Sequence, residues 1–274
     1  AATGVNFSPT AATTVSSDVA VNSILQGSTG YAVSINSGIT LTVSSGAMAY
    51  AGSGSTNVGA SAGTGTLSFG GVEGMVFMLT GNTQTINSVI AGTGGMTVSG
   101  MNGSLLLSAT NTYSGVTTLN SHNTGVSKNR VILGNNTSTG SILNSSSIVL
   151  NGTESNIAFG RTGTVTYSAP ISGSGQIFMW YGTTTLSGNN TFSGPTTLQN
   201  TVTTKAGSST AFGTGAVTVS SGTTLDLNGN SLTVGSLAGA GTVSSSAAGT
   251  LTLTAGGDNT STSFSGVLQN GSAT

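Results

Sequence analysis

The sequence predicts an all-β fold: a right-handed parallel β-helix, or β-solenoid, of roughly 12 turns that forms an elongated rod. Three observations support this fold class. Short apolar runs alternate with Gly, Asn and Ser turns, no segment shows a helical pattern, and one motif recurs along the chain. With about 22 residues per turn and a rise of about 4.8 Å per turn, the rod would be about 55 to 60 Å long.

The strand prediction rests on alternation of apolar and polar residues with a period of two. Ile39–Val43 reads ITLTV and Val217–Val219 reads VTV, and a Gly, Asn or Ser turn follows such runs at short intervals. No window of 11 or more residues repeats its apolar positions with the 3.6-residue period of an amphipathic helix. We therefore expect strands throughout and almost no helix.

The repeat is visible in two nearly identical segments. Asn111–Leu119 reads NTYSGVTTL and Asn190–Leu198 reads NTFSGPTTL, and a looser third copy contains an FSGVL run near the end of the chain. Each copy follows a Gly-rich preamble. With these preambles, the copies lie near residues 87–121, 167–200 and 237–271.

A single repeat of this composition cannot fold alone. It carries too few apolar side chains to offset the conformational entropy lost when about 22 residues are ordered, so neighbouring repeats must stack on one another. A β-sandwich has a similar strand pattern and is the rival fold, but the in-phase repeat favours the solenoid. We expect one domain over residues 1–274, with residues 1–26 as an N-terminal strand or cap segment.

Composition narrows the possible partners. Asp, Glu, Lys and Arg together make up 3% of the chain, against about 25% in an ordinary domain, and the formal net charge is −1. No basic patch exists that could neutralise nucleic acid phosphates, and no apolar run is long enough to insert into a membrane. The chain has no cysteine, which suits an oxidising exterior.

The charged residues predict no enzyme, no cofactor and no metal site. The closest two of the five acids are 32 residues apart in sequence, whereas glycoside hydrolysis needs a pair of carboxyl groups. Asp226 alternates with Leu225 and Leu227 and should point outward from a strand. The segment His122–Arg130 holds two of the four cationic residues and is interpreted as a solvated insertion loop.

Two apolar clusters stand out in this polar chain: Met75–Leu79, which reads MVFML, and Ile177–Tyr181, which reads IFMWY. They could fill the core where a turn widens. Alternatively, since consecutive residues of a strand face opposite sides, some of them would form an exposed stripe for contact between subunits.

The repeats resemble the passenger-associated transport repeats of bacterial autotransporters and related surface proteins. The resemblance covers residues 90–119, 171–198 and 213–271, about half of the chain, and includes TTLDLNGNSLTVGSLAGAGTV at Thr223–Val243. It implies a parallel β-helix at or beyond the bacterial cell surface, acting as a stalk or carrier, and it implies no catalytic residues. The start of the chain, AATG, fits a mature secreted protein.

These observations predict a secreted structural protein, a subunit of a cell-surface fibre or stalk that polymerises with itself, head to tail, by strand complementation. The alternatives are an adhesin passenger domain that binds a surface glycan and a carbohydrate-active β-helix enzyme. The residues predicted to form the subunit interface are Val5, Phe7, Val15, Val19, Val21, Ile24, Leu25, Phe264, Val267 and Leu268.

Overall fold

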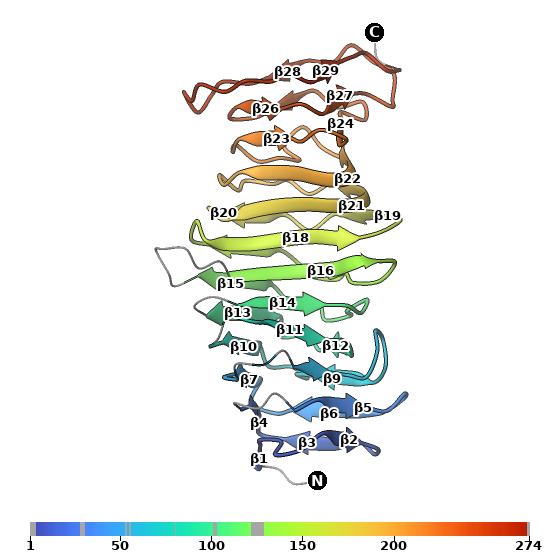
Figure 1. The fold of residues 1–274 in the computed structure, drawn as a ribbon, viewed down its shortest axis with the longest axis vertical. Coiled ribbons are helices and arrows are strands. Elements are labelled where there is room, and N and C mark those ends of the chain that lie inside the picture. The colour runs from blue at the N-terminus through green and yellow to red at the C-terminus, as the bar shows by residue number, and fades with distance from the viewer. Residues whose placement is uncertain are drawn as a thin grey trace.

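The computed structural model describes residues 4–27, 31–52, 54, 56–79, 81–100, 103–121 and 129–272. The chain winds into a tall stack of about 12 turns, as expected for a right-handed parallel β-solenoid, and the two termini lie at opposite ends of the rod (Figure 1). None of the described residues is helical, and accordingly no described segment is a helix that could cross a membrane.

The strands form four sheets. Sheet A contains β1 (Asn6–Phe7), β4 (Ser23–Gln26), β7 (Ala47–Tyr50), β10 (Gly74–Met78), β13 (Met96–Gly100), β15 (Thr117–Ser121), β17 (Ile148–Asn151) and β20 (Ile171–Gly173). Sheet C contains β3 (Val19–Val21), β6 (Thr40–Val43), β9 (Thr66–Ser68) and β12 (Val89–Ala91), and a small fourth sheet pairs β25 (Leu232–Thr233) with β28 (Leu253–Thr254).

Sheet B runs almost the whole length of the rod. Its main path contains β2 (Thr13–Val15), β5 (Val33–Ile35), β8 (Asn57–Val58), β11 (Thr83–Ile86), β14 (Ser104–Leu107), β16 (Asn129–Thr137), β18 (Ser155–Arg161), β21 (Gln176–Leu186), β22 (Thr196–Ala206), β24 (Thr224–Asp226), β27 (Thr242–Ser244) and β29 (Val267–Leu268). Three further strands pair beside this path: β19 (Thr164–Tyr167), β23 (Val217–Val219) and β26 (Leu237–Gly239).

The order of strands within each sheet follows from the winding of the chain. In the first turns, neighbours in a sheet differ by three in chain order, as in β1, β4, β7 and β10, because each turn adds one strand to each of three sides. All strand pairs in the described part of the chain are parallel, for example β10 with β13, where Val76 lies beside Val98. This is the arrangement that stacking demands, since each turn supplies the hydrogen-bond partners of the next.

The core consists of side chains stacked in columns along the axis. One column on sheet B contains Leu107, Leu133, Phe159, Met179 and Leu198, which are paired in register and almost fully buried. Burial alternates along a strand, as β6 and β13 show, with one residue inside and the next outside. Stacking thus supplies the burial that a single turn cannot provide.

The repeated motif is a corner module. In the first copy, Thr112 N donates to Ile90 O at 2.9 Å and Ser114 N donates to Gly92 O at 3.1 Å. In the second copy, the equivalent bonds join Thr191 to Ile171 and Ser193 to Gly173, both at 2.9 Å. The third copy repeats the second bond, from Ser265 N to Gly239 O at 2.8 Å.

The three copies occupy three different corners. The first lies against β12 of sheet C on the preceding turn and leads into β15 of sheet A, and the second lies against β20 of sheet A and leads into β22 of sheet B. The third lies against β26, where Gly239 forms a bridge with Phe264, and leads into β29. Both strands belong to sheet B, in which β22 pairs with both β23 and β24. The motif therefore specifies a bend and not a fixed side of the rod.

The first residue of the motif explains the need for asparagine. Asn111 is buried, and its Oδ1 accepts the N–H of Ile90 while its Nδ2 donates to Ala109 O and Ser141 O. Asn190 does the same in the second copy, accepting from Ile171 N and donating to Ala211 O. One amide side chain thus pairs an isoleucine N–H that the bend would leave unpaired inside the protein, and it adds bonds to neighbouring carbonyls.

Candidate functional site

Most of the predicted interface residues lie in the first and last described turns. At the N-terminal end, Phe7, Val15, Val19 and Val21 line an open cavity of about 280 Å³, together with Leu41 and residues 13–17. Its walls are the inward-facing apolar side chains of β1, β2 and β3, where the core columns begin. This end of the rod therefore presents apolar core side chains at an open surface.

At the C-terminal end, β29 leaves two apolar side chains uncovered. Leu268 pairs with the buried Val243, which places it at the end of a core column, yet it is 64% exposed. Val267 lies above Thr242 on the outer side and is 53% exposed, whereas Phe264 is half-buried against the core. The described turns thus end in an apolar edge at this end as well.

Three predicted residues differ from the others in their surroundings. Ile24 lies in the core at 1% exposure, and its neighbour Leu25 points outward from the flank of sheet A at 43% exposure. Val5 is 53% exposed just before β1, and its carbonyl accepts the N–H of Asn22. The structure therefore gathers Phe7, Val15, Val19 and Val21 at one end, and it leaves Leu25 on the side of the rod.

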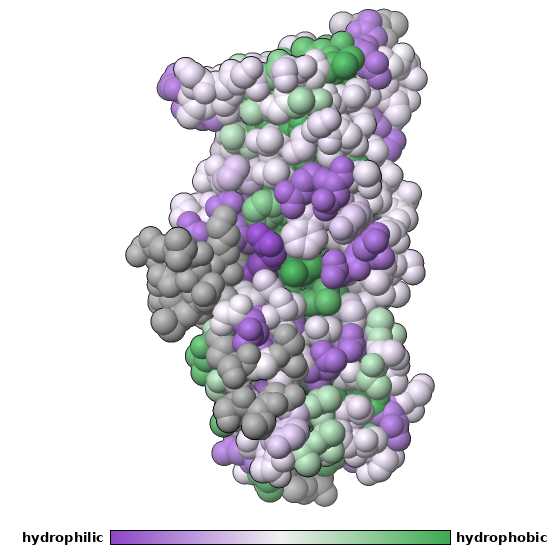
Figure 2. Space-filling model, in the orientation of Figure 1, coloured by the Kyte–Doolittle hydropathy of each residue, from purple (hydrophilic) through white to green (hydrophobic). Residues whose placement is uncertain are grey.

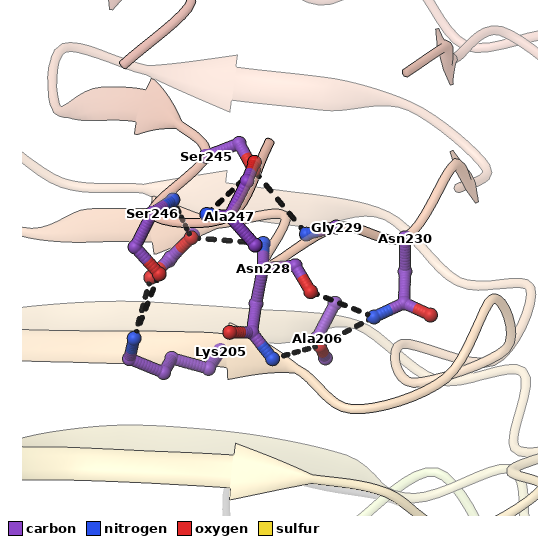
Figure 3. Close-up of polar contacts among 9 residues, drawn as sticks. Lys205, Ala206, Asn228, Gly229, Asn230, Ser245, Ser246 and Ala247 are labelled. Atoms are coloured by element: carbon purple, nitrogen blue, oxygen red, sulfur yellow. Dashed lines mark hydrogen bonds and ion pairs between the residues drawn. The ribbon is translucent and has the colours of Figure 1, made fainter. Parts of the chain in front are cut away.

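Figure 3 shows a polar cluster that includes Lys205, Asn228 and Ser246, which all bind the carboxylate of Asp226. Asp226 Oδ2 lies 2.9 Å from Lys205 Nζ, and Oδ1 accepts the N–H groups of Asn228 and Ser246, each at 2.8 Å. Lys205 also donates to Ser246 Oγ at 2.9 Å. The cluster links β22, β24 and the residues that follow β27, which lie on successive turns. Its side-chain bonds therefore hold three neighbouring turns together.

Asp226 lies beside Lys205 in the column that alternates with the core residue Leu225, as expected, but it is not open to solvent. Its neighbour Leu225 faces the core as predicted, but Asp226 is itself 4% exposed because Lys205 and Ser246 cover it. Burial alone would raise the pKa of Asp226, but the hydrogen bonds from Ser246, Lys205 and Asn228 outweigh burial and hold that pKa below its usual value. Its oxygens are occupied by structural contacts.

The interpretation of His122–Arg130 as one solvated loop also changes. Residues 122–128 lie outside the described residues, but Arg130 belongs to strand β16. Its guanidinium carbon lies 4.8 Å from the centroid of the Phe178 ring and 5.4 Å from that of Trp180. Arg130 is half-buried, because the aromatic residues of a strand two turns away reach it.

Each of the two apolar clusters has side chains in the core and side chains on the surface. In Met75–Leu79, Val76 and Met78 are fully buried, while Met75, Phe77 and Leu79 are 37%, 39% and 51% exposed. In Ile177–Tyr181, Ile177 and Met179 fill the core, while the alternate residues Phe178 and Trp180 face outward and are half-buried. Each cluster therefore contributes to the core and to the surface at once.

The remaining acids form no common site in the described part of the chain. Asp18 accepts the N–H of Thr40, Asp258 accepts from Thr260, and Glu73 accepts a short hydrogen bond from the Thr97 hydroxyl. No group of three or more His, Asp or Glu side chains among the described residues could hold a metal ion.

Comparison with family models, with curated proteins and with solved structures found no match for this chain.

Proposed function

We propose that the chain is an extracellular structural protein, a rigid rod that assembles head to tail into a fibre or stalk at a bacterial cell surface. The observation that carries this proposal is the pair of apolar ends: an open cavity lined by Phe7, Val19 and Val21 in the first turn, and the exposed Val267 and Leu268 in the last. Strand edges and apolar columns of this kind are completed by another strand.

The geometry supports an open-ended assembly. The two ends of the rod differ, so a contact between them is heterologous, and a heterologous contact that does not close yields a filament. The parallel stacking that joins β27 to β29 within the chain would continue from β29 to β1–β3 of the next copy. The low content of charged residues also leaves little repulsion between copies.

The same features favour a location outside the cell. A long parallel stack held by backbone hydrogen bonds and uncharged Ser, Thr and Asn side chains needs neither disulfides nor ion pairs, and the chain has no cysteine to oxidise. The resemblance of its repeats to autotransporter passenger repeats points in the same direction. A rod of this type holds other groups away from the surface that bears it.

Charged substitutions at the two ends test the proposal. Val5→Asp and Leu268→Asp each change an exposed side chain, so both variants should fold. The intact protein is expected to form filaments at high concentration in light scattering and negative-stain imaging. Each variant alone should stay monomeric, and an equimolar mixture should stop at dimers, because one Val5 end and one Leu268 end remain intact between the two variants.

Leu143→Asp is the matched control, since Leu143 is 40% exposed on the flank, and this variant should polymerise like the intact protein. A monomeric intact protein would contradict head-to-tail assembly and would favour a single stalk. Dimers of Val5→Asp alone would show that like ends associate, which also contradicts the proposal.

A further inference from the structure

A positively charged aromatic surface lies on the outer face of sheet B, half-way along the rod. Arg130 extends from β16 across the turn above and reaches Phe178 and Trp180 of β21, with 4.8 and 5.4 Å between its guanidinium carbon and the two ring centroids. Figure 2 looks onto this face, and over the middle turns it shows an apolar area bordered by hydrophilic side chains.

Small residues in the strand beneath leave room for the two rings. Ala158 pairs with Phe178 in register, and both lie in one outward column with Ile132. Gly160 lies below Trp180, where an added Cβ would be 3.2 Å from Cε3 of the indole. Small residues in the intervening strand thus let the two rings lie against the backbone instead of standing away from it.

The charge of Arg130 has no acidic partner among the described residues. Lys205 is paired with Asp226, and Arg161 donates to the carbonyl of Ser138 at 2.8 Å, whereas no carboxylate of the described chain lies within ion-pair distance of Arg130. A guanidinium stays protonated at physiological pH even where burial lowers its pKa, as it does for Arg130. The surface therefore carries a permanent, uncompensated positive charge.

The surroundings favour a sugar over a peptide. Beyond Gly134, strand β16 continues into Asn135 and Asn136, both exposed, and Gln176 lies at the near end of β21. Amide groups donate to and accept from hydroxyl groups, flat rings stack on the C–H faces of pyranose sugars, and the guanidinium fork binds a carboxylate through two hydrogen bonds. An acidic sugar offers all three: hydroxyl groups, a C–H face and a carboxylate.

We propose that this surface, formed by Arg130, Phe178 and Trp180, binds a polysaccharide that contains uronic acid residues. The sugar ring stacks beside the two aromatic side chains and its carboxylate pairs with the guanidinium. The surface lies on the flank of the rod, away from both ends, so the proposal does not depend on head-to-tail assembly. A fibre of such rods would present one site per subunit.

Binding of polygalacturonate to the intact protein, measured by calorimetry at low and at moderate salt, tests the proposal. We expect binding that weakens with salt, and a loss of at least tenfold in affinity for Arg130→Gln and for Trp180→Leu. Arg130→Lys keeps the charge without the fork and should bind with intermediate affinity. Arg161→Gln removes the same charge from the same strand system and should leave binding unchanged.

Three outcomes would overturn the proposal: no binding of polygalacturonate by the intact protein, equal binding of neutral dextran, or an equal loss of affinity in Arg161→Gln and Arg130→Gln. Circular dichroism of each variant separates a lost site from a lost fold. Sulfated dextran serves as a further probe, because equal affinity for it would mean that the site reads negative charge and not a carboxylate, which also contradicts the proposal.

Discussion

Two buried tyrosines of the same core differ in whether their hydroxyl group has a hydrogen-bond partner. Tyr50 and Tyr113 are both buried to 1% exposure or less. The Tyr113 hydroxyl bonds to Thr117 Oγ1 at 2.8 Å, and Thr117 bonds in turn to Ser145, whereas the Tyr50 hydroxyl is buried without a hydrogen-bond partner. An unpaired buried hydroxyl destabilises the folded state, and a paired one does not.

The two positions should therefore respond oppositely to loss of the hydroxyl. Tyr50→Phe is expected to leave the free energy of unfolding unchanged or to raise it, since it removes an unsatisfied polar group without changing shape. Tyr113→Phe is expected to lower it by about 1 kcal/mol, the net value of one hydrogen bond. Denaturant unfolding measures both. A larger loss for Tyr50→Phe than for Tyr113→Phe would contradict this account.

At the scale of the element, the corner module ties local sequence to the stack. Its asparagine pairs backbone groups from more than one turn, and its glycine allows two turns to approach: an added Cβ at Gly194 would lie 1.9 Å from the carbonyl oxygen of Gly175. The module can thus stabilise a bend, whichever two sides the bend joins. This explains why three copies lie at three corners.

Removing the asparagine side chain should be costly. Asn111→Ala leaves the N–H of Ile90 without its acceptor, and an unpaired buried group costs about 1 to 3 kcal/mol. The carbonyls of Ala109 and Ser141 each lose one bond but still accept the backbone N–H groups of Ser141 and Asn111. We expect a loss of about 2 to 3 kcal/mol in the free energy of unfolding, measured by denaturant titration.

The control for this prediction is Asn151→Ala. Asn151 is exposed, and its side-chain amide donates to Asn120 Oδ1 at 2.7 Å, so its loss should cost less than about 0.5 kcal/mol. Equal effects at the two positions would mean that the corner bonds add nothing specific to the stability of the stack.

The alternation of apolar and polar residues and the repeat were sufficient to predict the solenoid. They did not predict which outward-facing side chains are buried. Outward residues are covered by neighbours from other turns, about 20 residues away in sequence: Lys205 lies 21 residues before Asp226, and Ser246 lies 20 residues after it. The spacing was a usable signal for this cluster. Arg130 gave no such signal, because its partner Phe178 lies two turns away.

At the scale of the whole molecule, stability depends on few titrating groups. The pKa of Asp226 is lowered in the folded protein, so its contribution is present above the unfolded pKa of about 4 and is lost as the pH falls below it. Burial raises the pKa values of Tyr50, Tyr113 and Tyr167, so their contribution is complete below the unfolded pKa of about 10 and is lost above it.

The melting temperature should therefore be nearly constant between about pH 4 and pH 9 and should fall on both sides. The alkaline side is the steeper, because each buried tyrosine costs about 1.4 kcal/mol for every pH unit above 10, or roughly 4 kcal/mol per unit for the three. Thermal unfolding followed by circular dichroism across this range measures the profile.

Tyr50→Phe should reduce the alkaline slope by about one third, since one of three equal contributions is removed. A shift of more than about 10 °C within the plateau would mean that other groups titrate on unfolding, and an unchanged alkaline slope in Tyr50→Phe would mean that its hydroxyl is not buried.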